Sequence, residues 1–199
     1  MTHLRILLLA LSGALVTASA PLVLHGTFRD APPPAHTGGF GEPTCHACHV
    51  GSDLNDARGA LDITVPDYYT PGASYGIRVR LKHPEMMAGG FQLSIRDASG
   101  AQAGRFVMDT ASTGVTTLNG IAYVHHRRVS ASTNTDSIVW TFDWIAPDRA
   151  GSVTIHSAAN AANDDASPLG DFVYAESAVV NGRAHGTPVS VPGTIKRPH

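Results

Sequence analysis

One sequence feature restricts the fold of this chain more than any other. In the run IVWTFDW, residues 138–144, large apolar side chains alternate strictly with smaller or polar ones. Its large apolar side chains occupy every second position: Ile138, Trp140, Phe142 and Trp144. Successive side chains of a strand point to opposite faces, so these four would share one face and bury it. The runs YGIRVRLK at 75–82 and FQLSIR at 91–96 alternate similarly. The three runs predict half-buried β-strands around a common core.

Weaker alternation elsewhere extends this pattern along the chain. The further candidate strands are residues 61–65, 105–108, 121–126, 152–157, 172–180 and 188–191. With turns such as ASG at 98–100 and LNG at 118–120 between them, they give about nine strands at the spacing of a β-sandwich. The 199 residues are 43% apolar and 15% charged, which suits one globular domain with a real core. We therefore expect an all-β sandwich without long helices.

The N-terminus has the features of an export signal. Arg5 precedes an apolar run at 6–16, and the small residues Ala18, Ser19 and Ala20 follow. This predicts a signal peptide over residues 1–20. Pro21 would hinder cleavage there, and the apolar stretch continues to residue 24, so an uncleaved anchor is the alternative. Either outcome predicts a location on the periplasmic or extracellular side of a bacterial membrane, with membrane attachment only through the N-terminus.

The exported part divides into three stretches. Residues 25–58 are rich in proline and glycine and should form an extended segment, residues 59–192 the β-sandwich, and residues 193–199 a tail. The net charge of -2 includes no long run of lysine and arginine, which argues against nucleic acid as a partner.

The chemistry is concentrated in the pentapeptide CHACH, residues 45–49, which holds both cysteines of the chain. Cys-x-x-Cys-His is the attachment motif of c-type haem. Cys45 and Cys48 would form thioethers with one porphyrin, and His49 would ligate its iron. The motif therefore predicts one covalently bound haem c.

Two other interpretations of the pentapeptide are weaker. A redox-active disulfide of the thioredoxin kind requires a βα turn, whereas here a Pro/Gly-rich stretch precedes Cys45. A zinc site could use Cys45, Cys48, His49 and one further histidine, but zinc sites usually bring a second closely spaced pair of ligands. Such a pair is not evident in the sequence.

The sixth ligand of the iron has several candidates. His125 and His126 lie in a predicted strand, so their rings point to opposite faces and only one can approach a haem. Met86 or Met87 could instead supply a thioether, which would raise the reduction potential relative to a second imidazole. The other histidines are more simply explained as ordinary surface residues.

Several motifs, in order along the chain, resemble bacterial Reeler-like, choice-of-anchor V domain proteins. They are TGGFGEPTCHACH at 37–49, YTPG at 69–72, GFQL at 90–93, YVHHR at 123–127, WTFDWIAP at 140–147, AANAAN at 158–163 and GD at 170–171. The resemblance implies an immunoglobulin-like β-sandwich of Reeler type, preceded by a haem-binding segment. Its "Y..H" motif points to His126 as the distal ligand, with Val124 on the same, haem-facing side. The doubled histidine departs from the family pattern and keeps His125 as an alternative.

We expect an exported monohaem cytochrome that transfers single electrons, rather than an enzyme. The redox partner is not identifiable from the sequence. Two other hypotheses remain: a non-catalytic surface adhesion or interaction module with a structural haem or none, and a haem sensor or peroxidase with a displaceable distal ligand. Among weaker features, Arg78, Arg80, Arg127 and Arg128 could pair with haem propionates, although the solvent-exposed face of a strand explains them better. Asp164, Asp165 and Asp171 could bind calcium, although a solvated loop explains them better.

Overall fold

The computed structural model describes residues 28–108, 111–128 and 135–183. The predicted signal peptide or anchor, the strand at 188–191 and the tail lie outside these residues. Nothing therefore tests the predictions for those three parts. Within the described part, no helix is long and apolar enough to cross a membrane.

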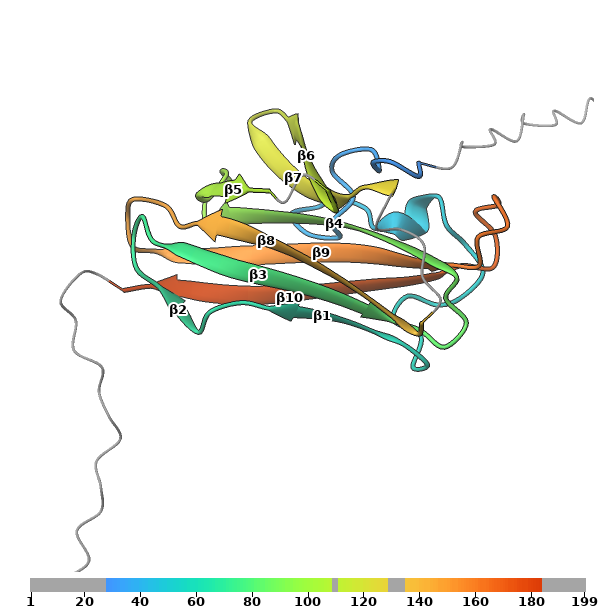
Figure 1. The fold of residues 1–199 in the computed structure, drawn as a ribbon. Helices are drawn as coiled ribbons and strands as arrows, with labels where there is room; N and C mark the ends of the chain where they lie inside the picture. The colour runs from blue at the N-terminus through green and yellow to red at the C-terminus, as the bar shows by residue number, and fades with distance from the viewer. Residues whose placement is uncertain (1–27, 109–110, 129–134, 184–199) are drawn as a thin grey trace, which may run out of the picture.

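Two sheets pack face to face in the described part of the chain (Figure 1). One sheet has the order β1 (Ala60–Thr64), β3 (Ser74–Lys82), β8 (Ser137–Ile145), β5 (Arg105–Val107). The other has the order β2 (Tyr68–Tyr69), β10 (Phe172–Gly182), β9 (Ser152–Ala162), β4 (Ala88–Asp97), β7 (Ile121–His126), β6 (Thr113–Leu118). Only β2 and β10 pair in parallel among these strands. The predicted fold class, an all-β immunoglobulin-like sandwich after an irregular segment, is confirmed.

The alternating runs form the core strands, as predicted. In β8 the four large apolar side chains at positions 138, 140, 142 and 144 are buried, and β3 buries Ile77, Val79 and Leu81 in the same way. Phe91 from the opposite sheet packs on Trp140 with ring centroids 4.7 Å apart. Apolar burial between the sheets therefore holds the sandwich together.

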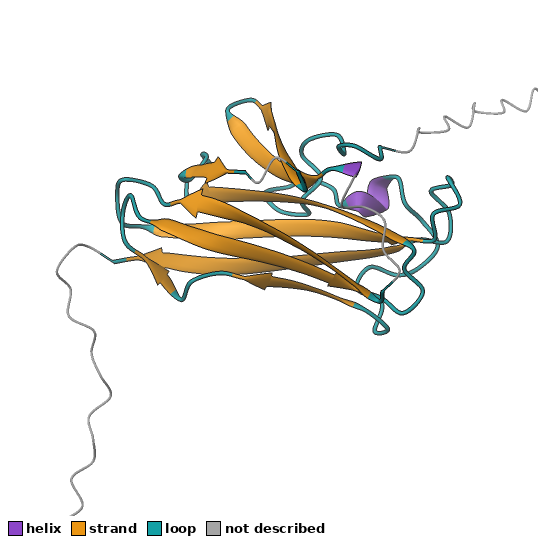
Figure 2. Cartoon of the chain, viewed as in Figure 1, coloured by secondary structure: helices purple, strands orange, loops and turns teal. Residues whose placement is uncertain are grey.

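Two strands and one helical turn were not expected from the sequence. The two-residue β2 is too short to show any periodicity. In β6, TGVTTL has no continuous apolar face, and its pairing with β7 defines it as a strand. Asn119 and Gly120, with φ of 50° and 79°, form the tight turn between β6 and β7. The helical turn is a 3-10 turn, η1 (Cys45–Ala47), seen in purple in Figure 2.

The segment before η1 covers the outer face of the six-stranded sheet. Gln92 of β4, between the core residues Phe91 and Leu93, points away from the core and is fully buried. Its side chain donates to the Pro33 carbonyl at 2.9 Å and accepts from the His36 N–H at 2.8 Å. The Pro/Gly-rich segment thus packs against the sheet through specific polar contacts and brings η1 to it.

Candidate functional site

The cysteine pentapeptide, residues 45–49, is wound into a tight turn. Thr44 caps η1, since its hydroxyl accepts the His46 N–H at 3.1 Å. The N–H groups of Cys48 and His49 both donate to the Cys45 carbonyl, at 3.1 and 2.9 Å. Residues three and four positions apart in such a turn lie on one side. Cys45, Cys48 and His49 consequently face the same space.

That space is a cavity of about 270 Å³ at one end of the six-stranded sheet. Cys45, Cys48 and His49 line it together with His126 of β7. Its apolar walls come from both the N-terminal segment and the sandwich: Phe28, Pro32, Pro33, Ala88, Phe91, Ala162 and Ala166. The structure thus brings the predicted covalent and proximal residues and the preferred distal histidine to one site.

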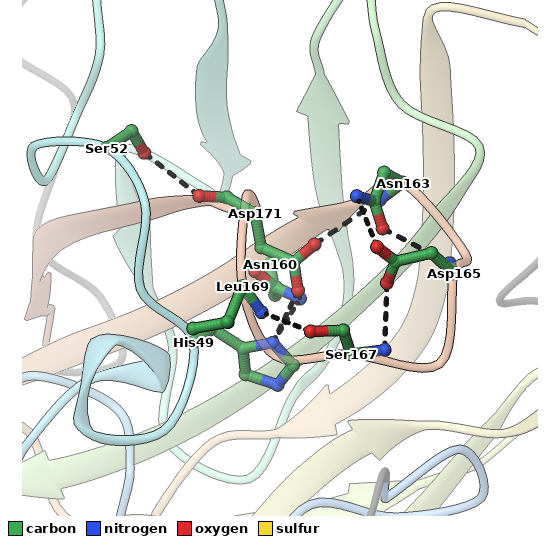
Figure 3. Close-up of polar contacts among 8 residues, drawn as sticks. All are labelled: His49, Ser52, Asn160, Asn163, Asp165, Ser167, Leu169 and Asp171. Atoms are coloured by element: carbon green, nitrogen blue, oxygen red, sulfur yellow. Dashed lines mark hydrogen bonds and ion pairs between the residues drawn. The ribbon is translucent and has the colours of Figure 1, made fainter.

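His49 is oriented by a buried carboxylate. Its Nδ1 lies 2.6 Å from Oδ2 of Asp171, whose side chain is fully buried, and 3.0 Å from the amide nitrogen of Asn160 (Figure 3). The same amide donates to the Asp171 carboxylate at 3.0 Å. An ionised carboxylate only accepts hydrogen bonds, so in a contact with ionised Asp171 the donor is Nδ1–H of His49. Nε2 points away from this cluster in Figure 3.

His126 is buried against the backbone of β4. Its Nδ1 lies 3.1 Å from the Phe91 nitrogen and 3.4 Å from the Phe91 carbonyl oxygen. Burial lowers the pKa of His126 to about 4, so the ring is neutral near pH 7 and has one nitrogen lone pair. This lone pair lies on Nε2 in the tautomer whose Nδ1–H donates to the Phe91 carbonyl. A ligand of iron must be in this neutral form.

The two histidines approach the same face of the sheet. A Cβ at Gly90 would lie 2.5 Å from Cε1 of His126, so the ring of His126 lies over Gly90. Gly90 of β4 pairs with Asn160 of β9, which contacts His49. Side chains of directly paired residues project from the same face of a sheet. The rings of His49 and His126 therefore stand near neighbouring positions of paired strands.

The other candidate ligands do not line the cavity. His125 points elsewhere, with Nε2 3.1 Å from the Thr116 hydroxyl and Nδ1 2.9 Å from the His126 carbonyl. Met86 is 4% exposed in the core, and Met87 is 55% exposed. Val124 alternates onto the same side of β7 as His126, but it packs in the core and does not line the cavity.

The two cysteines are free thiols. Burial raises the pKa of Cys45 to about 12, so this thiol is protonated at neutral pH and is a poor nucleophile for disulfide exchange. Among the described residues, no group of three or more His, Cys, Asp or Glu side chains could hold a metal ion. A haem iron needs only axial ligands from the protein, because the porphyrin supplies the others. Two imidazoles for the iron and two thiols for the porphyrin therefore suit haem c.

Charged residues near the cavity differ in part from those expected. Arg29 and Arg128 line it, and Arg29 pairs with Asp164 at 2.5 Å. Asp165 bonds to its own loop through Asn163 and Ser167. Sequence reasoning grouped Asp171 with these aspartates and missed its contact with His49. The only signal was its place in the GD motif at 170–171.

The sequence and the β-sandwich fold of this chain were compared with those of known proteins. No family profile matches the chain, and no curated protein matches it. The Reelin-N domain of F-spondin is 20% identical with a TM-score of 0.46, covering 70% of this chain and 95% of that one. A non-cellulosomal cohesin from Archaeoglobus fulgidus is 8% identical with a TM-score of 0.32, covering 59% and 90%. Similarity at these levels carries no argument about activity.

Proposed function

We propose that this protein is an exported monohaem c-type cytochrome that carries single electrons. One observation supports this most: Cys45, Cys48 and His49 share one apolar cavity with His126, although these residues come from distant parts of the chain. A surface pentapeptide matching by chance would not require a buried, neutral histidine in the same cavity. The proposed location is the periplasmic or extracellular side of the membrane.

Each of these residues has a distinct role in the proposal. Cys45 and Cys48 would attach the porphyrin, His49 would be the proximal ligand of the iron, and His126 the distal one. When bound, haem c supplies one-electron chemistry between ferric and ferrous iron. The apolar walls, including Phe28 and Pro33, would exclude water from the iron's surroundings.

The fixed positions of both imidazoles favour electron transfer over ligand binding. His49 is held by Asp171, which is itself bonded to Asn160. His126 is packed on Gly90 and contacts the Phe91 carbonyl through Nδ1. Side chains held in this way stay in place when the charge of the iron changes. A displaceable distal ligand, as a haem sensor or peroxidase needs, is therefore disfavoured. Two imidazoles also imply a lower potential than one imidazole and one methionine thioether.

The first test is spectroscopic, on full-length protein expressed with a cytochrome c maturation system. We expect a positive pyridine haemochrome assay, an intact mass increased by one haem, and a low-spin spectrum. Replacing His126 with Ala should give a high-spin spectrum, whereas the matched control His125→Ala should stay low-spin, because His125 does not line the cavity. An unchanged spectrum in His126→Ala would remove this residue as the ligand.

The β-sandwich itself supports a second candidate, a non-catalytic interaction module. Many cell-surface domains share this architecture without sequence similarity. Wild-type protein that lacks covalent haem after expression with the maturation system would favour this candidate.

A further inference from the structure

The proximal histidine of the proposed haem contacts a side chain that carries a full negative charge when ionised. The 2.6 Å contact joins Nδ1 of His49, whose side chain is 27% exposed, to a carboxylate with no exposure. A hydrogen bond from a ligating imidazole to a carboxylate makes the imidazole a stronger donor to the metal. A bond to a neutral carbonyl does so less, because it lacks the charge.

The carboxylate of Asp171 is held in place on several sides. Its Oδ2 accepts from the amide of Asn160 at 3.0 Å, and its Oδ1 accepts from the Asn163 N–H at 3.3 Å (Figure 3). The hydroxyl of Ser52 donates to the Asp171 carbonyl at 3.0 Å. All three partners are neutral, so they hold Asp171 in place without cancelling the charge of its carboxylate. A hydrogen bond in such a buried setting is stronger than in water.

The main chain sets the distance between Asp171 and His49. The Val50 N–H donates to the Pro168 carbonyl at 2.9 Å, and the Gly170 N–H donates to the Val50 carbonyl at 2.8 Å. A Cβ at Gly51 would lie 2.6 Å from the Gly170 nitrogen, which shows how closely the two segments approach. The residues adjoining His49 and Asp171 are thus joined directly. The contact between the two side chains is built into the fold.

We propose that Asp171 is a positioning residue that holds His49 in the Nδ1–H form and strengthens its Nε2 as a donor to the haem iron. This inference rests on the proposed haem. A stronger donor stabilises ferric relative to ferrous iron, so Asp171 lowers the reduction potential. One electron, from the redox partner or from an electrode, converts ferric to ferrous iron, while the Nδ1 proton stays on His49.

The first arm of the test needs no haem. In full-length protein labelled with ¹⁵N-histidine and expressed without the maturation system, NMR reports which ring nitrogen of His49 is protonated. Wild type should show the Nδ1–H form, and Asp171→Ala should lose this preference. Asp165→Asn is the control, because Asp165 lies on the same loop and, within the described part of the chain, bonds to Asn163 and Ser167 rather than to His49. An unchanged His49 in Asp171→Ala would overturn the inference; if that variant does not fold, Asp171→Asn replaces it.

The second arm measures the reduction potential of the haem-loaded protein. Asp171→Asn keeps the size of the side chain and an oxygen acceptor but removes the charge. We expect the ferrous-to-ferric ratio at a given potential to rise about 10- to 100-fold, which is roughly 60–120 mV for one electron. Asp165→Asn should stay within about twofold of wild type. Equal potentials in the two variants would overturn the inference and leave the cytochrome proposal standing. Wild-type protein without haem would overturn that proposal, while the NMR result would still decide what Asp171 does to His49.

Discussion

The paired strands β3 and β8 and the segment at residues 28–49 are both well packed, but different interactions hold them. β3 and β8 pair over nine consecutive residues and bury alternate apolar side chains. The segment packs on the sheet through single polar contacts, such as those of Gln92 with Pro33 and His36. The sandwich is therefore stabilised by many apolar contacts of similar kind, and the cavity wall by a few specific hydrogen bonds.

The largest effect should follow from a change in the sandwich core. Trp140 is fully buried and packs on Phe91, so Trp140→Ala should cost about 3–5 kcal/mol of unfolding free energy through lost burial and a cavity. The neighbouring Val139 is 42% exposed on the other face of β8, and Val139→Ala should cost well under half as much. Urea unfolding measures both. Equal losses would contradict the assigned faces of β8.

The sandwich core and the cavity also differ in how much of each could be predicted from the sequence. A period of two is visible in the amino-acid sequence, so the strands built on Ile77, Phe91 and Trp140 were located correctly. Local spacing likewise showed that Cys45, Cys48 and His49 belong together. The residues that complete the cavity had no such signal, because a contact such as that of Asp171 with His49 depends on tertiary structure. The preference for His126 came from a resemblance rather than from spacing.

The second largest loss of unfolding free energy should follow from a change at Glu42, in the segment at residues 28–49. Glu42, three residues before Cys45, accepts hydrogen bonds from Thr37 at 2.7 Å, from Tyr123 of β7 at 2.6 Å and from Arg96 of β4. Glu42→Gln should cost about 1.5–3 kcal/mol, because these are charge-assisted bonds in a nearly buried site. Glu85→Gln is the control, since Glu85 is 61% exposed in its pair with Arg58 and should cost under about 1 kcal/mol.

The same residue gives the segment a pH dependence. Burial alone would raise the pKa of Glu42, but the hydrogen bonds from Thr37, Tyr123 and Arg96 outweigh it and hold the pKa below its ordinary value of 4.5. A lowered carboxyl pKa stabilises the folded state above pH 4.5, and this stabilisation is lost as the pH falls through the folded-state pKa. The protection of residues 37–49 against hydrogen exchange, relative to the intrinsic rate at each pH, should therefore fall below pH 4.5 in wild type. In Glu42→Gln this protection should already be low at neutral pH and change less on acidification.

The smallest loss of unfolding free energy should come from adding a methyl group at Gly39, and it tests how closely the segment packs on the sheet. A Cβ at Gly39 would lie 2.1 Å from Cγ of the His156 ring on β9, so Gly39→Ala must displace the segment or the ring. We expect a loss of about 1–3 kcal/mol, as for other overpacked sites. In β3, a Cβ at Gly76 would meet its nearest atom, Oδ1 of Asp143, at 3.8 Å, so Gly76→Ala should be neutral or stabilise by up to about 1 kcal/mol. Because neither glycine has a positive φ, the difference between the two variants measures how tightly the segment lies on the sheet. Equal urea midpoints would show that the segment can lift from β9 without cost, so that polar contacts such as those of Glu42 and Gln92 hold the wall of the cavity in place.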